Sequence, residues 1–292
     1  MAYCRFDRVI VIGCGNIVLT TLKYIASIRD KYLFNMTYVR HEIQEYSSVL
    51  NLCDELNIES FRLREKKEVT AFFEKITEKT LVVSAGNHYL FPMKVLEKDN
   101  LTVINFHNAL LPEYPGRNAP SWVIYCGEYE SGATWHYVNK DIDAGTIIWQ
   151  GKCLISEDTK AYELTMAIMD MAQKGLETFF EELLEKDIVG IKQDISPDRK
   201  IYYSYEVPGN GEFSIDDTAE VIYRLLRSLD YGKFGPFPKA HTVLPAGECV
   251  EIIRYKKQEN ADKIKEYRIN NNEIEIPFDN EEALLLRFKS KT

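Results

Sequence analysis

The sequence has few cysteines for its length and places none of them in a metal-binding or disulfide pattern. Six cysteines are scattered over 292 residues, with no Cys-x-x-Cys pair and no histidine at ligand spacing. Zinc sites and disulfide frameworks depend on such spacing, so we expect no metal, no disulfide framework and a reducing compartment. The six are Cys4, Cys14, Cys53, Cys126, Cys153 and Cys249.

Long hydrophobic runs are also missing. No apolar stretch approaches the length of a membrane span, and the N-terminal residues MAYCRFDR lack the apolar region of a signal peptide. The sequence therefore predicts a soluble cytoplasmic protein with no membrane partner.

Positive charge is in deficit. The chain has 36 Lys and Arg against 45 Asp and Glu, a formal net charge of −9. Such a surface repels polyanions, although a local basic patch could override the average. The lysines near the C-terminus (Lys256, Lys257, Lys263, Lys265) alternate with acids, as on an ordinary solvated surface. We therefore expect no nucleic-acid partner.

Apolar runs and helix-period segments alternate along the first two thirds of the chain. Arg8 to Ile12 reads as a buried strand that ends at Gly13, and Ile17 to Ile28 has helical periodicity. Further strands are expected at 36–40, 81–84, 101–106 and 133–138, with extended segments at 146–150 and 152–155 on either side of Gly151. Helices are expected at 47–56, 67–76, 121–125 and 162–184. This alternation predicts an α/β fold, a doubly wound, mostly parallel Rossmann-like sheet, over residues 1–195.

The remainder has a different pattern. Ser196 to Glu212 is polar and rich in Pro and Gly, which indicates a linker, and Asp216 to Leu229 reads as a capped helix. Apolar runs at 240–244 and 249–255 flank Pro-Ala-Gly-Glu, a hairpin signal, and short strands are expected at 273–276 and 283–288. We predict a smaller C-terminal helix-plus-β module over residues 205–292.

Chemistry-bearing residues gather between Val103 and Gly145. Asn105 and His107 end the strand 101–106 two residues apart, so their side chains share one face at the edge where open α/β sheets bind ligands. Asp143, in a turn closed by Gly145, could orient His107. Each feature alone is also ordinary, since a strand-end histidine is often structural and Asp-Ala-Gly is common turn chemistry.

Two other loops follow expected strands. The turn Gly13-Cys14-Gly15-Asn16 resembles a dinucleotide fingerprint but has Val18 where the third glycine belongs. It is therefore a sharp turn, a phosphate site at a helix N-terminus or, least favoured, a nicotinamide site. In the aromatic loop 85–92, His88 is a rival acid/base candidate that lacks an adjacent amide.

The combined pattern resembles a known family. Asn105-x-His107, followed by Leu-Leu-Pro, a Gly-Arg loop at Arg117 and Asp143-x-Gly145, is similar to the formyltransferases that use 10-formyltetrahydrofolate. These include methionyl-tRNA formyltransferase, glycinamide ribonucleotide formyltransferase and the sugar N-formyltransferases. The resemblance covers roughly residues 9–184, and the chain departs from it at Ala109, where the family usually has Ser.

The resemblance implies a role for each matching position. Asn105 would donate to the oxyanion, His107 would take the amine proton, and Asp143 would orient His107. The folate co-substrate, 10-formyltetrahydrofolate, would be bound by His88, Tyr89, Leu90, Asn139 and Asp141. The acceptor would be bound by Gly13, Gly15, Asn16 and Arg117. No metal is required.

The acceptor is open among several alternatives. A nucleotide-linked amino sugar is favoured as a small-molecule substrate, because the acidic charge disfavours tRNA. A non-catalytic folate-binding protein on the same fold is disfavoured by the intact Asn-His-Asp set. Glycinamide ribonucleotide formyltransferases do not call for nearly a hundred extra C-terminal residues. A homodimer is compatible with the sequence.

Overall fold

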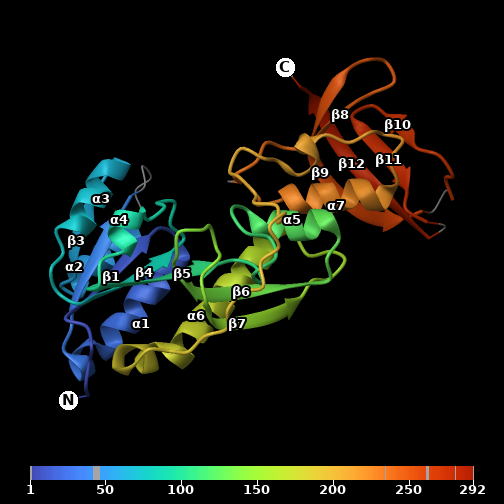
Figure 1. Ribbon diagram of the computed structural model, residues 1–292. Coiled ribbons are helices and arrows are strands. Elements are labelled where there is room, and N and C mark those ends of the chain that lie inside the picture. The colour runs from blue at the N-terminus through green and yellow to red at the C-terminus, as the bar shows by residue number, and fades with distance from the viewer. Residues whose placement is uncertain (1, 42–46, 234, 261–262, 280, 292) are drawn as a thin grey trace. The chain divides into compact units, whose positions relative to one another are not determined.

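A computed structural model of the chain describes residues 2–41, 47–233, 235–260, 263–279 and 281–291 (Figure 1). Its contacts define two compact units. The first comprises Met1–Gly116, Gly132–Cys153 and Ala167–Ile201, and the second comprises Arg117–Ser131, Leu154–Met166 and Tyr202–Thr292. The simpler division predicted from the sequence, 1–195 and 205–292, stays a prediction about independent domains.

A mixed sheet forms the centre of the first unit. Within the described residues its strand order is β3-β2-β1-β4-β5-β6-β7. The pairs from β3 to β5 are parallel, and β6 runs antiparallel to β5. The strands are β1 (Arg8–Gly13), β2 (Asn35–Arg40), β3 (Glu59–Arg62), β4 (Thr80–Ala85), β5 (Leu101–His107), β6 (Glu130–Tyr137) and β7 (Ile147–Leu154). This confirms the predicted doubly wound, mostly parallel sheet.

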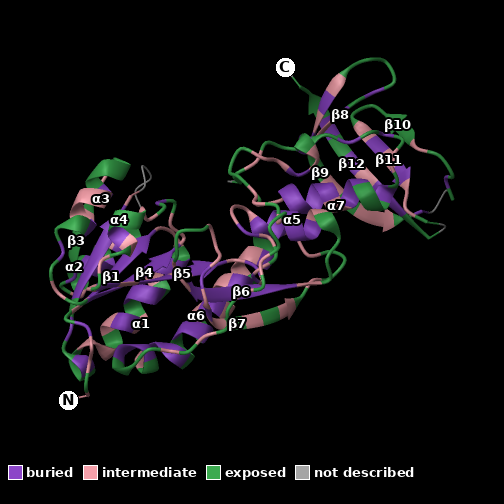
Figure 2. Ribbon diagram, in the orientation of Figure 1, coloured by how far each residue is buried: buried purple, intermediate pink, exposed green. Residues whose placement is uncertain are grey.

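Helices cover both faces of this sheet (Figure 1). On one face, α3 and α4 bury Val69, Phe73 and Val95 against β1 and β4. On the other face, α1 and α6 meet through the rings of Tyr24 and Phe180. The helices of this part are α1 (Asn16–Tyr32), α2 (Ser47–Glu55), α3 (Lys66–Glu74), α4 (Met93–Leu96) and α6 (Ala161–Glu185). Figure 2 shows the buried strands between these half-exposed helices, as the period-2 and period-3.6 patterns require.

Gly13 brings two loops together at the carboxyl edge of the sheet. It pairs with Ala85 across β1 and β4, and any Cβ at Gly13 would lie 1.8 Å from the Ala85 carbonyl oxygen. Its φ of 140° also lies outside the range that side chains favour. The Cys14 thiol donates to the Gly86 carbonyl at 3.1 Å. The loops after β1 and β4 are therefore held side by side.

The second unit contains an antiparallel sheet, with order β10-β11-β12-β9-β8 among the described residues. The hairpin predicted around Pro245-Gly247 is confirmed, because β8 pairs antiparallel with β9. Helix α7 buries Ile222, Leu225 and Leu226 in the core of this unit. Its elements are α5 (Ala119–Cys126), η1 (Pro208–Gly211), α7 (Ala219–Leu229), β8 (His241–Val243), β9 (Cys249–Glu259), β10 (Arg268–Asn270), β11 (Glu273–Pro277) and β12 (Glu282–Ser290).

Two elements differ from the sequence-based expectation. The segments expected at 146–150 and 152–155 form one strand, β7, that passes through Gly151. A Cβ at Gly151 would lie 2.5 Å from the Trp149 ring, so the glycine allows that ring to pack against the strand. Strand β3 was not expected, because its Glu-Ser-Phe-Arg sequence is mostly exposed and lacks apolar alternation. No helix in the described part of the chain is long and apolar enough to cross a membrane.

Candidate active site

A row of polar side chains crosses three strands at the carboxyl edge of the sheet. The register pairs Asn105 on β5 with Ser84 on β4 and with His136 on β6. Directly paired residues lie on one face, so the three side chains meet. The Ser84 hydroxyl donates to Asn105 Oδ1 at 2.8 Å, and Asn105 Nδ2 lies 3.2 Å from His136 Nε2.

These contacts fix the orientation of the Asn105 amide. His136 Nδ1 lies 2.8 Å from the Tyr137 carbonyl oxygen, which can only accept, so Nδ1 carries the proton and Nε2 accepts from Asn105. The flipped amide is excluded because it would turn its oxygen toward His136 Nε2, which has no proton to donate. One of the two Asn105 N–H groups is used by His136. The other is the donor that the site can offer a ligand.

His107 ends β5 and is almost fully enclosed, with 4% of its surface exposed. Its Nε2 lies 2.9 Å from the Tyr114 carbonyl oxygen, which places a proton on Nε2. Its Nδ1 faces Asp143 Oδ2 at 3.3 Å. Burial lowers the pKa of His107, against the raising effect of the Asp143 carboxylate. His107 is therefore neutral near pH 7, and a second proton would enter at Nδ1 beside the carboxylate.

Asp143 is held as a carboxylate between two histidines. Burial raises its pKa, but the interactions with the His107 and His136 rings and with the Gly116 N–H, at 2.7 Å, outweigh burial and hold that pKa below its usual range. Asp143 Oδ1 also lies 3.6 Å from His136 Nε2. A Cβ at Gly145 would lie 1.6 Å from the Tyr137 carbonyl oxygen. Glycine there lets the Asp143 loop approach β6.

The cluster therefore offers three functions in one unit of the protein. Asn105 is an oriented neutral donor, His107 a neutral base, and Asp143 a carboxylate beside the nitrogen that gains the proton. An acyl transfer to an amine needs these groups, because its tetrahedral intermediate bears an oxyanion and its attacking nitrogen loses a proton.

The residues predicted to bind the folate lie in two loops. In the loop after β4, His88 is exposed and Leu90 is 65% exposed, whereas Tyr89 is buried. The Tyr89 ring packs on Phe73, and its hydroxyl bonds Thr70 at 2.7 Å. The Tyr89 side chain is thus part of the core, and the faces that this loop exposes are those of His88 and Leu90.

Asn139 and Asp141 shape the loop that carries Asp143. Asn139 Nδ2 donates to the Ala144 carbonyl at 3.1 Å, and its Oδ1 accepts from the Asp141 N–H at 3.1 Å. The Asn139 side chain therefore closes the loop on itself.

The residues predicted to bind the acceptor fall in different units. Gly15 precedes α1 with a φ of 79°, and Asn16 is the first residue of that helix. The first turn of α1 contains no acidic residue, so its N–H groups form an electropositive end. Arg117 belongs to the second unit, where its N–H donates to the Tyr202 carbonyl at 2.8 Å.

Sequence reasoning missed His136, Ser84 and the Tyr114 carbonyl. The strand Ala133 to Val138 was expected, but the contact of His136 with the site can be recognised only from its pairing with Asn105. Pairing register is a tertiary property that strand periodicity does not reveal.

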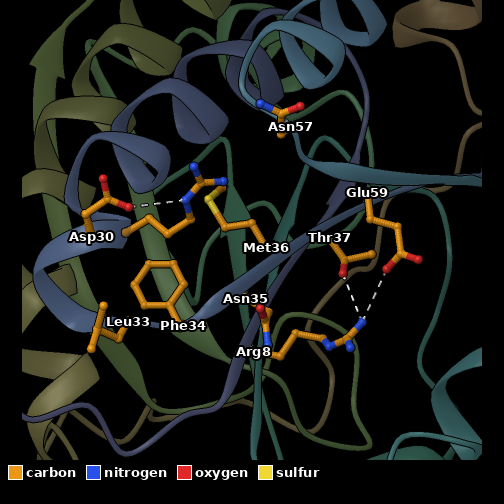
Figure 3. Close-up of a pocket in the computed structure, with 10 residues that line it drawn as sticks. Arg8, Asp30, Leu33, Phe34, Asn35, Met36, Thr37, Asn57 and Glu59 are labelled. Atoms are coloured by element: carbon orange, nitrogen blue, oxygen red, sulfur yellow. Dashed lines mark hydrogen bonds and ion pairs between the residues drawn. The ribbon is translucent and has the colours of Figure 1, made fainter.

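A cavity of about 550 Å³ lies elsewhere in the first unit (Figure 3). Its lining includes Arg8, Asn35 and Glu59, the first residues of β1, β2 and β3, so it sits at the amino edge of the sheet, opposite the Asn105 cluster. Its charges are paired, with Arg8 bonded to Thr37 and close to Glu59. We therefore place the candidate acyl-transfer site at the Asn105 cluster and not at this cavity.

Among the described residues, no group of His, Cys, Asp and Glu side chains is placed to hold a metal ion.

The fold and the Asn105 cluster together form a candidate acyl-transfer site on an open α/β sheet. Residues 36–179 match the model of the family described as formyl transferase.

The curated relatives include formyltransferases named for two different acceptors, methionyl-tRNA and GDP-perosamine. A methionyl-tRNA formyltransferase of Ureaplasma urealyticum is 24% identical over 209 residues, 67% of each chain. A GDP-perosamine N-formyltransferase of Brucella melitensis is 29% identical over 160 residues, 55% of this chain and 59% of the relative. The chain thus spans about two thirds or less of the length of these curated relatives.

A solved structure shares the fold. An N-formyltransferase of Helicobacter canadensis, in complex with folinic acid and dTDP-3-aminofucose, matches with a TM-score of 0.73. The match has 15% sequence identity and covers 97% of this chain and 100% of that one. It includes the C-terminal sheet as well as the seven-stranded sheet.

Proposed function

We propose that the protein is an N-formyltransferase that moves the formyl group of 10-formyltetrahydrofolate to the amine of a nucleotide-linked amino sugar. The observation that carries the proposal is the meeting of Asn105, His107 and Asp143 inside the formyl transferase segment. The Helicobacter canadensis enzyme, which was solved with a folate and an amino sugar nucleotide, supports it through its fold.

On this proposal the amine nitrogen attacks the formyl carbon, and the carbonyl π electrons move to oxygen as the new C–N bond forms. The second Asn105 N–H donates to that oxyanion. His107 takes the amine proton, and Asp143 stabilises the imidazolium. Collapse of the intermediate expels the folate N10, which receives a proton from His107. The products are tetrahydrofolate and the formylated amine.

We assign the folate to the loops 88–90 and 139–144, the second of which carries Asp143. The exposed His88 and Leu90 would line the pterin, and Asn139 and Asp141 would shape the second loop. We assign the acceptor phosphates to Gly13, Gly15 and Asn16 at the N-terminus of α1. Arg117, which belongs to the other unit, stays a sequence-based prediction of an acceptor contact.

The proposal is tested by direct assay. The purified chain is incubated with 10-formyltetrahydrofolate and, in turn, dTDP-, UDP- and GDP-linked amino sugars. Tetrahydrofolate release is followed by absorbance and the formylated sugar by mass spectrometry. We expect turnover with one nucleotide class and none with the matching hydroxyl sugars. No formylated product with any amino sugar would exclude the sugar acceptor.

Methionyl-tRNA is the second candidate acceptor. It is favoured by the Ureaplasma urealyticum relative and by other methionyl-tRNA formyltransferases of similar identity. It is disfavoured by the net charge of −9. Charged initiator tRNA therefore belongs in the same assay, where we expect no formylation.

A further inference from the structure

The chain that follows α6 returns to the catalytic loop. We call residues 190–201 the return segment. Ile191 and Ile147 exchange two backbone hydrogen bonds of 2.8 Å, which align this segment with the start of β7. A Cβ at Gly190 would lie 2.1 Å from the Ile147 carbonyl oxygen, so glycine allows the close approach. The return segment lies beyond residue 179, where the family match ends.

Gln193 and Arg199 of the return segment hold three carbonyls of the loop that carries Asp143. Gln193 Nε2 donates to the Asp143 carbonyl at 3.0 Å and to the Gly145 carbonyl at 2.7 Å. The Arg199 guanidinium donates to the Ile142 carbonyl through Nη2. Two side chains from outside the loop thus bond three of its residues, Ile142, Asp143 and Gly145.

The loop needs such support because its backbone is strained. Asp143 has a φ of 49°, in the left-handed region that residues other than glycine rarely adopt. A strained residue keeps its conformation only where its surroundings over-determine it. The carbonyl of Asp143 itself is one of those that Gln193 holds.

Arg199 also contributes charge to the site. Its Nη1 is buried and has no hydrogen-bond partner among the described residues. A buried donor without an acceptor is costly. Burial has the largest effect on the pKa of His107 and lowers it, and the Asp143 carboxylate, the His136 ring, the Tyr114 carbonyl and the Arg199 guanidinium also act on that pKa. The Arg199 charge lowers the pKa of His107, and the Asp143 carboxylate raises it.

We propose that Gln193 and Arg199 are positioning residues of the formyl transfer: Gln193 fixes Asp143 against His107, and Arg199 fixes the Ile142 end of the same loop and adds a positive charge. The role in turnover rests on the proposed function, whereas the effect on the His107 ring does not. The two residues act on His107 in opposite directions. Gln193 holds a carboxylate near the ring, and Arg199 holds a cation near it.

The experiment follows the His107 ring by NMR, independently of activity. The chain has five histidines, His41, His88, His107, His136 and His241, so the ring signals can be assigned by single substitutions. We expect Arg199→Gln to raise the pKa of His107 and Arg199→Lys to leave it near the wild-type value. Gln193→Ala should lower it, because Asp143 is no longer held. Lys192→Gln removes an exposed charge from the same segment and serves as the control.

Turnover is measured on the same variants. Gln193→Ala and Arg199→Gln should each lower kcat by between about tenfold and a hundredfold with little change in KM, since misplacement of a catalytic group has this cost. A merely structural role would lower the thermal midpoint and leave kcat and the His107 titration of the folded protein unchanged. Unchanged titration in both variants overturns the proposal. Shifted titration in a chain without formyl transfer activity would refute the proposed function alone.

Discussion

At the scale of single residues, the site depends on which atoms remain available to a substrate. The Asn105 oxygen accepts from Ser84, and one of its N–H groups donates to His136. One N–H of Asn105 therefore remains available to a substrate. We expect Asn105→Ala to lower kcat by about 10²-fold or more, the usual cost of removing an oxyanion donor. Steady-state kinetics, with circular dichroism to confirm folding, would measure this. If Asn105→Ala retained more than about a tenth of wild-type kcat, a group other than Asn105 would have to be the oxyanion donor.

The pH dependence of the reaction reports on His107. Burial lowers the pKa of His107, so the neutral base persists below the ordinary value of about 6.5 and is lost as pH falls through the lowered pKa. The acid limb of kcat/KM should therefore have its midpoint below about pH 6.5. A pH profile measured with saturating folate and limiting acceptor would test this. A midpoint at or above about pH 6.5 would mean that the Asp143 carboxylate raises the pKa of His107 more than burial lowers it.

At the scale of elements, strand register assembles the site. Ser84 on β4 donates to Asn105 on β5, and without that hydroxyl the Asn105 amide can rotate. Ser84→Ala should reduce kcat by about tenfold, since orientation of a catalytic group is worth this much. Thr80→Val, at the start of the same strand, removes a buried hydroxyl that donates to the Glu78 carbonyl, away from Asn105, and should leave kcat unchanged. Equal kcat in the two variants would show that register alone orients Asn105.

The sequence could predict the strands that carry Asn105 and His107 because their patterns are local. Alternating apolar residues and a Gly-rich turn specify a strand and its end without reference to the rest of the chain. The contacts of His136 and Gln193 could not be predicted in this way. They depend on which strand pairs with β5 and on where the return segment passes, and these are set by packing of residues far apart in sequence.

At the scale of the whole molecule, each unit has its own stabilising network. In the second unit, Asp230 at the end of α7 accepts from the Tyr255 hydroxyl at 2.7 Å and pairs with Lys160 at 3.0 Å. Burial raises the pKa of Asp230, but these contacts and the Gly232 N–H hold it below its usual range. The carboxylate therefore stabilises the fold above its unfolded pKa, and this contribution is lost as pH falls through the folded pKa.

Asp230→Asn should thus destabilise the second unit by about 1–3 kcal/mol near neutral pH and by less in acid. Hydrogen exchange of the α7 amides, followed by mass spectrometry at pH 7 and near pH 4, would measure both. Asp216→Asn is the matched control, because Asp216 is exposed and close in sequence to α7. If the loss of protection were the same at both pH values, the hydrogen bonds of the Asp230 side chain, and not its charge, would be what stabilises the second unit.

The charge of the whole chain bears on its acceptor. A nucleotide sugar needs only a few local donors, such as the N–H groups at the N-terminus of α1, whereas tRNA needs many phosphate contacts on a surface that carries −9. We expect a pyrimidine nucleoside diphosphate to bind with mild salt sensitivity and Arg117→Ala to weaken it about tenfold, as loss of one charge-assisted contact would. Calorimetry across a salt series would measure the slope. Binding of charged initiator tRNA with a steep salt slope, and no response to nucleotides, would instead assign the chain to tRNA.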